Sequence, residues 1–581
     1  MEKDILDAGS GIGAAPGESE NASAGDGESG TPTREGRLQK CFEGASRLGP
    51  LLLLCVLALY VWPEFSGKTF YFPPESENSQ ILGHVMKHGT WMAPSAGGVA
   101  QWPGFSACFT IILKFLRYFG ELAVFPALIA GLGAFCSFLT LLGAWCLSLS
   151  AGFGPRAALS AGLILLCAPI SALLVNFVSP ETLAVALTLF SFCCFCRGWQ
   201  KEKPGLAVPS GCLLAALAAL TGGPYYLFLP FLSSLIFLCW LGRVRRVQKP
   251  DAVFGFALCL VLIAAWLGSV MLGGHADGYL QQLRGAFLPS GNPQAASWWR
   301  PMPDAGAALL ALFPWPALVA FVSWTRVAGE AVNSFKAARA ECSGSAYVWI
   351  AFACAVLLSP LASDPVGPGM MICGLAALLL GKALLRLSNF GSRFFYLFVV
   401  LCLLISAVGL TALSFGYSRD WLAQTFHLAF SPRFSGDPAL PGIGLCCLAA
   451  AFILVRFTNL TKPAGALLAC TLLAAVLVQP VMVWLEPRFG DLYIMLWRRG
   501  GIEKNVGLPE QRSAVPTEKA PDPQSASKPE QSGQADAPTE SSAIPDNSSA
   551  GQSGSSTAEP VPKPGDAAPG PSIARPQTPE R

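Results

Sequence analysis

A polar segment between residues 70 and 91 carries the side chains best suited to chemistry. It reads FYFPPESENSQILGHVMKHGTW and holds Glu75, Glu77, His84 and His88, in a chain with only four histidines. The segment stands between the apolar run LLLLCVLALYVW and a long series of hydrophobic segments. A carboxylate close to a substrate hydroxyl acts as a general base, so we predict that an acid of this segment accepts a proton in a reaction.

The spacing of the two acids favours Glu75 for this role. Pro73 and Pro74 favour an extended entry and set the start of a helix, which places Glu75 in its first turn. The positive end of the helix dipole favours the ionised form that a base needs. Glu77 lies about 200° further around a helix, so the two acids do not face one substrate together. The alternative role for Glu75 is stabilisation of the helix N-terminus alone.

The histidines lead to a second interpretation of the same segment. Glu77, His84 and His88 recur at helical spacing and share one stripe of the predicted helix. Two imidazoles at i and i+4 together with an acid are ligand types for a divalent metal. The alternative is an amphipathic helix with a polar outer stripe and no metal. No other cofactor is indicated by the sequence.

The elements that must position these residues are membrane helices. Hydrophobic residues make up 52% of the chain, charged residues 13%, and the mean hydropathy is +0.49. Soluble globular domains do not have this composition. Runs of about 17 to 25 apolar residues are long enough to cross roughly 30 Å of hydrocarbon as helices. We therefore predict an all-α polytopic membrane protein, and we expect no nucleic acid among its partners.

About thirteen apolar segments are long enough to form such helices. Residues 45–500 contain them and form the predicted transmembrane domain, whereas the Gly- and Ser-rich residues 1–44 and the Pro-, Ser- and Ala-rich residues 501–581 are predicted to be disordered tails. The predicted spans are 46–63, 122–149, 157–178, 180–196, 206–221, 224–242, 252–273, 305–324, 346–362, 367–384, 394–415, 441–456 and 464–484.

Basic residues predict the orientation of these spans. Arg34, Arg37, Lys40 and Arg47 precede the first span, which places the N-terminus in the cytoplasm. If the spans alternate, most other basic loops fall on the same side, including the run from Arg243 to Lys249. The loop at 64–104 and the C-terminal tail are then expected outside.

Four polar clusters fall on the predicted outer side, and we expect the function there. They are the loop at 64–104, the turn before Glu181, the turn Thr221 to Pro224, and the loop at 273–304. A carboxylate at a membrane interface is costly unless it meets a partner or a water-filled cavity, which makes Glu181 a further catalytic candidate. Its alternative role is that of a helix N-terminal acid. We expect the clusters to converge on one pocket with a lateral opening for a lipid chain.

The order of these clusters resembles that of the GT-C membrane glycosyltransferases, especially the branch of the bacterial aminoarabinose lipid A transferases and protein O-mannosyltransferases. In that branch the first external loop opens with an Asp-Glu pair, and an amphipathic helix follows that ends in Gly-x-Trp-x-x-Pro, here GTWMAP. A Lys-Pro-Pro element comes next, here QWPGF, then an acid at the fourth span and a Thr-Lys-Gly-Pro turn, here TGGP. The matching residues are Glu75, Gly89, Trp91, Pro94, Glu181, Thr221, Gly223 and Pro224, with LFPW at 312–315 as a further family element.

Three positions depart from the family pattern. Pro74 stands where the first acid is expected, Gln101 where the loop lysine is expected, and Gly222 where the turn has its lysine. In the family that acid is implicated at the reacting centre, and the lysines help to hold the anionic lipid phosphate. A catalytically impaired relative, a membrane scaffold and a transporter are therefore the alternatives to an active enzyme.

The resemblance implies a glycosyltransferase in the plasma (inner) membrane of a bacterium. It would move a sugar from a polyprenyl-phosphate donor to a lipid, glycan or protein acceptor on the outer face, with membrane lipids around it. The leaving phosphate requires cations or other donors to offset its charge. A transporter should show internal repeats and charged or broken helices at the midplane, and we find no such repeat. The predicted substrate-binding residues are Lys87, Trp91, Gln101, Gly223, Pro224, Arg284 and Arg300.

Overall fold

The computed structural model describes the greater part of residues 46–457. Contacts divide the chain into Met1–Val506 and Gly507–Arg581, and everything described lies in the first unit. The two predicted tails and most of the predicted span at 464–484 lie outside the described residues. The described residues are 46–61, 73–96, 99–118, 125–168, 179–201, 205–273, 278–281, 283, 301–321, 324–341, 344–362, 366–385, 389–415, 439–457, 476–477 and 480.

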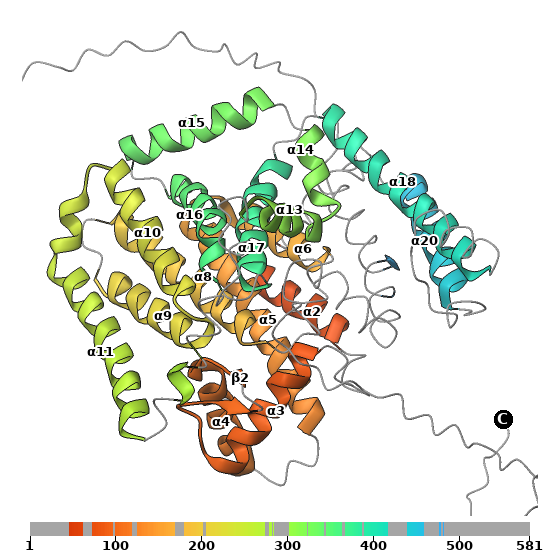
Figure 1. Ribbon diagram of the computed structural model, residues 1–581. Coiled ribbons are helices and arrows are strands. Elements are labelled where there is room, and N and C mark those ends of the chain that lie inside the picture. Colours follow the sequence, from red (N-terminus) through yellow and green to blue (C-terminus); the bar gives the residue numbers. More distant parts are fainter. Residues whose placement is uncertain are drawn as a thin grey trace, which may run out of the picture. The chain divides into compact units, whose positions relative to one another are not determined.

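Helices form nearly all of the described structure, as Figure 1 shows. The exception is a two-stranded antiparallel hairpin of β1 (Ser95–Ala96) and β2 (Val99–Ala100). The α-helices are α2 (Gly49–Val61), α3 (Pro73–His88), α4 (Pro103–Tyr118), α5 (Phe125–Ser150), α6 (Gly154–Leu166), α8 (Pro180–Gln200), α9 (Ala207–Gly222), α10 (Tyr225–Trp240), α11 (Pro250–Leu272), α13 (Pro301–Ala311), α14 (Leu318–Phe321), α15 (Trp324–Glu341), α16 (Ser345–Leu358), α17 (Val366–Leu384), α18 (Asn389–Ser414) and α20 (Ala439–Phe457).

The predicted all-α polytopic membrane fold is confirmed. Among the described residues, 6 helices are long and apolar enough to cross a membrane, and further apolar helices are shorter. Every predicted span except the last overlaps a described helix, although residues 169–178 of the predicted span 157–178 lie outside the described residues. The long apolar helices are α5, α8, α11, α17, α18 and α20, and the shorter ones include α2, α6, α9, α10 and α16.

The prediction of one continuous helix over residues 305–324 is wrong. Helix α13 ends at Ala311, and α14 begins only at Leu318 after a short 3-10 helix. The sequence LFPWP causes the break, because its two prolines lack the N–H donors that a continuing helix needs. Trp315 lies fully buried at the break, with its ring centroid 5.8 Å from that of Phe395. Irregular backbone is tolerated at this depth where protein covers it.

Helix α15 forms where the sequence predicts only a basic loop. Its 18 residues are too polar to cross a membrane, and four-residue spacing gives it one buried side. Ser334 and Ala338 are buried on that side, while Lys336 and Arg339 are exposed. The helix therefore lies along one end of the bundle, the upper end in Figure 1.

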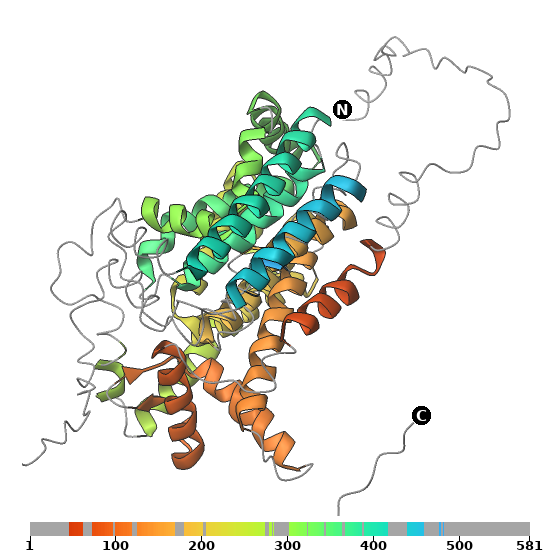
Figure 2. The same cartoon turned by 90° about the vertical axis from the view of Figure 1, so that its right-hand side faces the viewer.

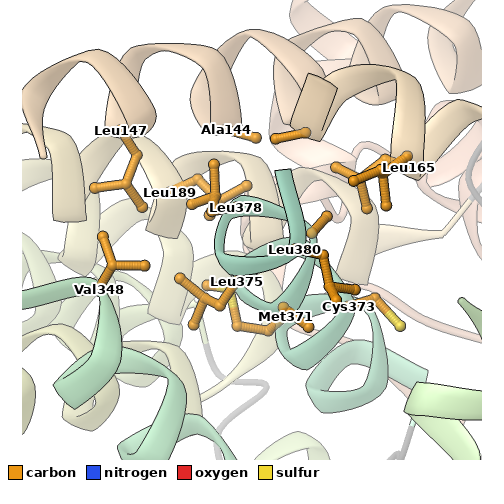
Figure 3. Packing of buried hydrophobic residues seen from close by; sticks show 14 of the residues in the cluster. Ala144, Leu147, Leu165, Leu189, Val348, Met371, Cys373, Leu375, Leu378 and Leu380 are labelled. Atoms are coloured by element: carbon orange, nitrogen blue, oxygen red, sulfur yellow. The ribbon is translucent and has the colours of Figure 1, made fainter. Parts of the chain in front are cut away.

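The core is centred on α17, which packs against α5, α6, α8 and α16. Figure 3 shows Leu378 of α17 beside Leu189 of α8, and Leu375 of α17 on the side that faces Val348 of α16. Helices α18 and α20 pack along each other beside this core (Figure 2). The apolar side chains of α11 and α18 are mostly exposed, as expected for helices that face lipid.

The two ends of α8 define two ends of the bundle. Its first turn packs Leu183 against Leu82 of α3 and Phe105 of α4, and we call this the loop end. Its last residues contact Ser150 at the C-terminus of α5 and Arg246 in the 3-10 helix η2 (Val244–Gln248), and we call this the basic end. A helix of 21 residues is about 30 Å long, which is the thickness of a membrane core.

Candidate functional site

Helix α3 holds the polar segment against the loop end of the bundle. It begins at Pro73, as predicted, so Glu75 lies in the first turn. Ile81, Leu82 and Val85 form its buried face, each about 1% exposed. Gly89 ends the helix with φ at +72°, a conformation that glycine adopts without strain. The side chains of Glu75 and Glu77 lie outside the described part of the structure, so their predicted catalytic roles stay predictions.

The two histidines of α3 lie together, as the helical spacing predicts. The ring centroids of His84 and His88 are 4.4 Å apart, and the rings are tilted by 34°. His84 is half-buried, and its Nδ1 has no hydrogen-bond partner among the described residues, whereas His88 is exposed. No group of three His, Cys, Asp or Glu side chains suited to a metal occurs in the described ranges, which do not include the side chain of Glu77. The metal site therefore stays a prediction.

Gln101 makes three hydrogen bonds that connect the loop after α3 to its neighbours. The Gln101 backbone N–H donates to the Pro94 carbonyl at 3.0 Å and closes the β1–β2 hairpin. The side-chain amide of Gln101 donates to the side chain of Asn78 in α3. The Tyr279 hydroxyl donates to the Gln101 carbonyl at 2.6 Å. The residue at the expected lysine position is therefore engaged within the loop, and its role in substrate binding stays a prediction.

The loop also packs against the ends of α9 and α11. The indole N–H of Trp266 in α11 donates to the Met92 carbonyl at 3.1 Å. Gly104 of α4 lies so close to α9 that an added Cβ would meet the Leu220 carbonyl at 3.0 Å and clash with the Thr221 hydroxyl. The apolar members of this contact are Ala93, Leu220, Trp266, Val270, Tyr279 and Leu283. Three of the four predicted outer clusters therefore meet at the loop end.

Glu181 places the fourth cluster at the same end. Ser179 caps α8, since its hydroxyl accepts the Glu181 backbone N–H at 3.1 Å and also donates to the Glu181 carboxylate. Glu181 is half-buried in the first turn, where the helix dipole favours its charge. Leu183 follows it into the contact with α3 and α4. The structure thus confirms the helix N-terminal position, and a catalytic role for Glu181 stays a prediction.

Tyr226 is a further residue at this end that the sequence does not single out. An added Cβ at Gly367, in the first turn of α17, would lie 3.2 Å from Cγ of Glu181 and would clash with the Tyr226 hydroxyl. An added Cβ at Gly222 would clash with the Tyr226 ring and lie 2.7 Å from Cβ of Ala184. Tyr226 is 1% exposed. Its ring fills the space that a side chain at position 222 would enter, so a larger residue there would require the Tyr226 ring to move.

Of the remaining predicted binding residues, four are described by the structure and two are not. Gly223 has φ at +97°, so the turn needs glycine here, and Pro224 caps α10. Trp91 is 38% exposed and Lys87 is exposed, so both are accessible at the loop end. Arg284 and Arg300 lie outside the described residues, and their predicted contacts stay predictions.

Removal of the Tyr279 hydroxyl is expected to loosen the loop. Burial raises the pKa of this phenol, so it stays a neutral donor to the Gln101 carbonyl throughout the physiological range. Tyr279→Phe deletes one buried hydrogen bond, and we expect a loss of about 1 kcal/mol in local stability. Hydrogen exchange at residues 91–101 should become faster, while exchange in α17 stays unchanged. Unaltered exchange across 91–101 would show that the bond does not hold the loop.

Comparisons with known proteins identify similar structures but no protein with a similar sequence. No family model and no curated protein matches the chain. The crystal structure of ArnT from Cupriavidus metallidurans bound to undecaprenyl phosphate aligns with a TM-score of 0.55 at 15% identity. The apo structure of the same protein aligns with a TM-score of 0.52 at 18% identity. Both alignments cover 76% of this chain and 77% of that chain. The chain therefore has the GT-C fold of ArnT.

Proposed function

We propose that the protein is a membrane glycosyltransferase that takes its sugar from a polyprenyl-phosphate donor. The observation that carries this proposal is the assembly of four polar clusters at one end of a GT-C fold. The loop after α3, the first turn of α8, the Thr221–Pro224 turn and Tyr279 all lie there. The related fold of ArnT, crystallised with undecaprenyl phosphate, supports a lipid phosphate as the ligand class.

In the proposed reaction, an acceptor hydroxyl attacks the anomeric carbon of the sugar. The bond between that carbon and the phosphate oxygen breaks, and the polyprenyl phosphate leaves with the bonding electrons. Glu75, in the first turn of α3, takes the proton of the attacking hydroxyl as the general base of the proposal. Lys87, Arg284 and Arg300 are the candidate cations that offset the charge of the leaving phosphate. The acceptor is a lipid, a glycan or a protein.

A second candidate function is that of a lipid-phosphate-binding relative without turnover. Two observations favour it. The Tyr226 ring fills the space beside Gly222, and the Gln101 amide bonds to Asn78. Positions 101 and 222, where the family pattern leads one to expect lysines, therefore supply no cation for a lipid phosphate. The two functions share a ligand and differ in whether the donor is consumed.

Consumption of the donor separates these two functions. We expect purified protein in detergent to release undecaprenyl phosphate from undecaprenyl-phosphate-linked pentoses or hexoses when an outer-envelope acceptor extract is added. The released lipid is measured by mass spectrometry, with binding of undecaprenyl phosphate measured in parallel. Binding without release from any donor would support the non-catalytic relative. Absence of both would contradict the proposal.

The proposed location is the bacterial inner membrane, with the loop end outside. The sequence-based orientation supports this, because the basic end carries Lys201, Arg246, Lys249 and Lys336. It places the N-terminus in the cytoplasm and the C-terminal tail outside. The proposed donor and acceptor then meet at the outer surface.

A further inference from the structure

We propose that the basic end carries a binding site for the headgroup of an anionic phospholipid. A shallow, partly open recess with an enclosed volume of about 10 Å³ lies between the C-terminus of α8 and the N-termini of α9 and α11. It stands at the opposite end of α8 from Glu181, about 30 Å away along the helix, so it is separate from the proposed transferase site. Its lining residues are Gly198, Trp199, Lys201, Val208, Arg246, Lys249 and Ala252.

Three of these lining residues are cations, and none is acidic. Arg246 is held in place, because its Nη1 donates to the carbonyls of Trp199 at 2.5 Å and Lys201 at 3.2 Å. A fixed guanidinium loses little freedom when it binds a phosphate, and its planar fork matches phosphate oxygens. Lys201 and Lys249 are exposed at the rim and add charge there. The recess is therefore suited to an anion with several oxygen acceptors.

Trp199 supplies an independent reason to expect a ligand. It is 3% exposed, and its indole Nε1 is buried with no acceptor among the described residues. The Phe195 ring stacks on it at 5.9 Å with an angle of 7°, which fixes the plane of the indole at the edge of the recess. A buried N–H without an acceptor is unfavourable, so a phosphate oxygen that reaches the indole from the recess would stabilise the bound state.

Apolar side chains beside the recess favour a lipid over free phosphate. Val253 and Phe254 follow Lys249 on α11 and are 53% and 59% exposed, and Leu206 before α9 is 78% exposed. In a membrane protein such side chains face acyl chains. A phospholipid would satisfy both sets of groups, with its phosphate on the cations and its tails along α11. Basic pockets between helices on the cytoplasmic side are a known setting for anionic headgroups.

Lipid titration of the full-length protein tests this site. The protein is purified in detergent and titrated with dioleoyl-phosphatidylglycerol, dioleoyl-phosphatidylcholine or inorganic phosphate, and bound lipid is measured by native mass spectrometry. We expect the phosphatidylglycerol complex to form at lower concentration than the phosphatidylcholine complex. Lys201→Gln/Lys249→Gln should weaken phosphatidylglycerol binding by about 10- to 30-fold at low salt. Trp199→Phe, which keeps the ring stack and removes the N–H, should weaken it to a smaller extent.

The matched control removes the same charge from the same end of the bundle. Lys336→Gln/Arg339→Gln changes two exposed cations of α15 and should leave phosphatidylglycerol binding unchanged. Lys201→Arg/Lys249→Arg should retain binding, which separates loss of charge from misfolding. Equal binding of the two lipids, equal losses in the test and control pairs, or displacement of the lipid by millimolar inorganic phosphate would each overturn the proposal. The result is independent of whether the protein transfers sugar.

Discussion

Glu75→Gln is expected to lower the rate of sugar transfer by about 10²- to 10⁴-fold, the usual contribution of a general base. The amide has nearly the shape of the carboxylate and cannot take the proton of the attacking hydroxyl. Helix α3 is held by Ile81, Leu82 and Val85 on its buried face, so folding should be retained. The measurement is release of undecaprenyl phosphate per protein, with folding checked by thermal unfolding of the same preparation.

Two further variants decide what such a loss means. Glu77 lies about 200° around the helix from Glu75, so Glu77→Gln tests the other side of α3. A larger loss of sugar transfer in Glu77→Gln than in Glu75→Gln would assign the base to Glu77 or support its role as a metal ligand. Asp251→Asn is the matched control, since Asp251 is an acid in the first turn of α11 at the basic end. It should leave transfer unchanged. Full turnover of Glu75→Gln would remove this residue from the mechanism.

The helices of the membrane domain could be predicted because their cause is local. Long apolar runs fold as helices in lipid whatever their neighbours, and proline and serine mark the start of α8 at Ser179 and Pro180. The same reasoning placed the start of α3 at Pro73. It did not find the break in span 305–324, although the two prolines of LFPWP are a local signal for it. Hydropathy alone therefore overstates the continuity of a helix.

The packing of the loop end could not be predicted, because it depends on residues far apart in the chain. Glu181, Tyr226 and Gly367 meet only once α8, α10 and α17 are packed together. From the sequence alone, glycine at position 222 is interpreted as the loss of a lysine. The structure shows that the Tyr226 ring occupies the space beside it. Helix α15 was missed for another reason, since its apolar stripe is narrow and its residues are polar on average.

Gly222→Lys is expected to destabilise the protein by about 3 kcal/mol or more. The new Cβ would clash with the Tyr226 ring and lie 2.7 Å from Cβ of Ala184, so the packed loop end would have to move. Overpacking of this kind costs about 1 to 3 kcal/mol, and partial burial of the ammonium adds to it. The melting temperature in detergent and the monodisperse fraction on size-exclusion chromatography should both fall.

Gly369→Lys provides the matched control, because Gly369 lies in the first turn of α17, at the same end of the bundle as Gly222, and an added Cβ there would meet nothing within 4 Å. It should retain the melting temperature of the wild type more closely than Gly222→Lys does. Tyr226→Ala in the Gly222→Lys background opens the space beside position 222, so we expect the pair to be more stable than the sum of the two single losses predicts. If this pair also transfers sugar faster than Tyr226→Ala alone, a lysine at position 222 promotes the transfer. Strictly additive losses would show that Tyr226 does not determine what position 222 accepts.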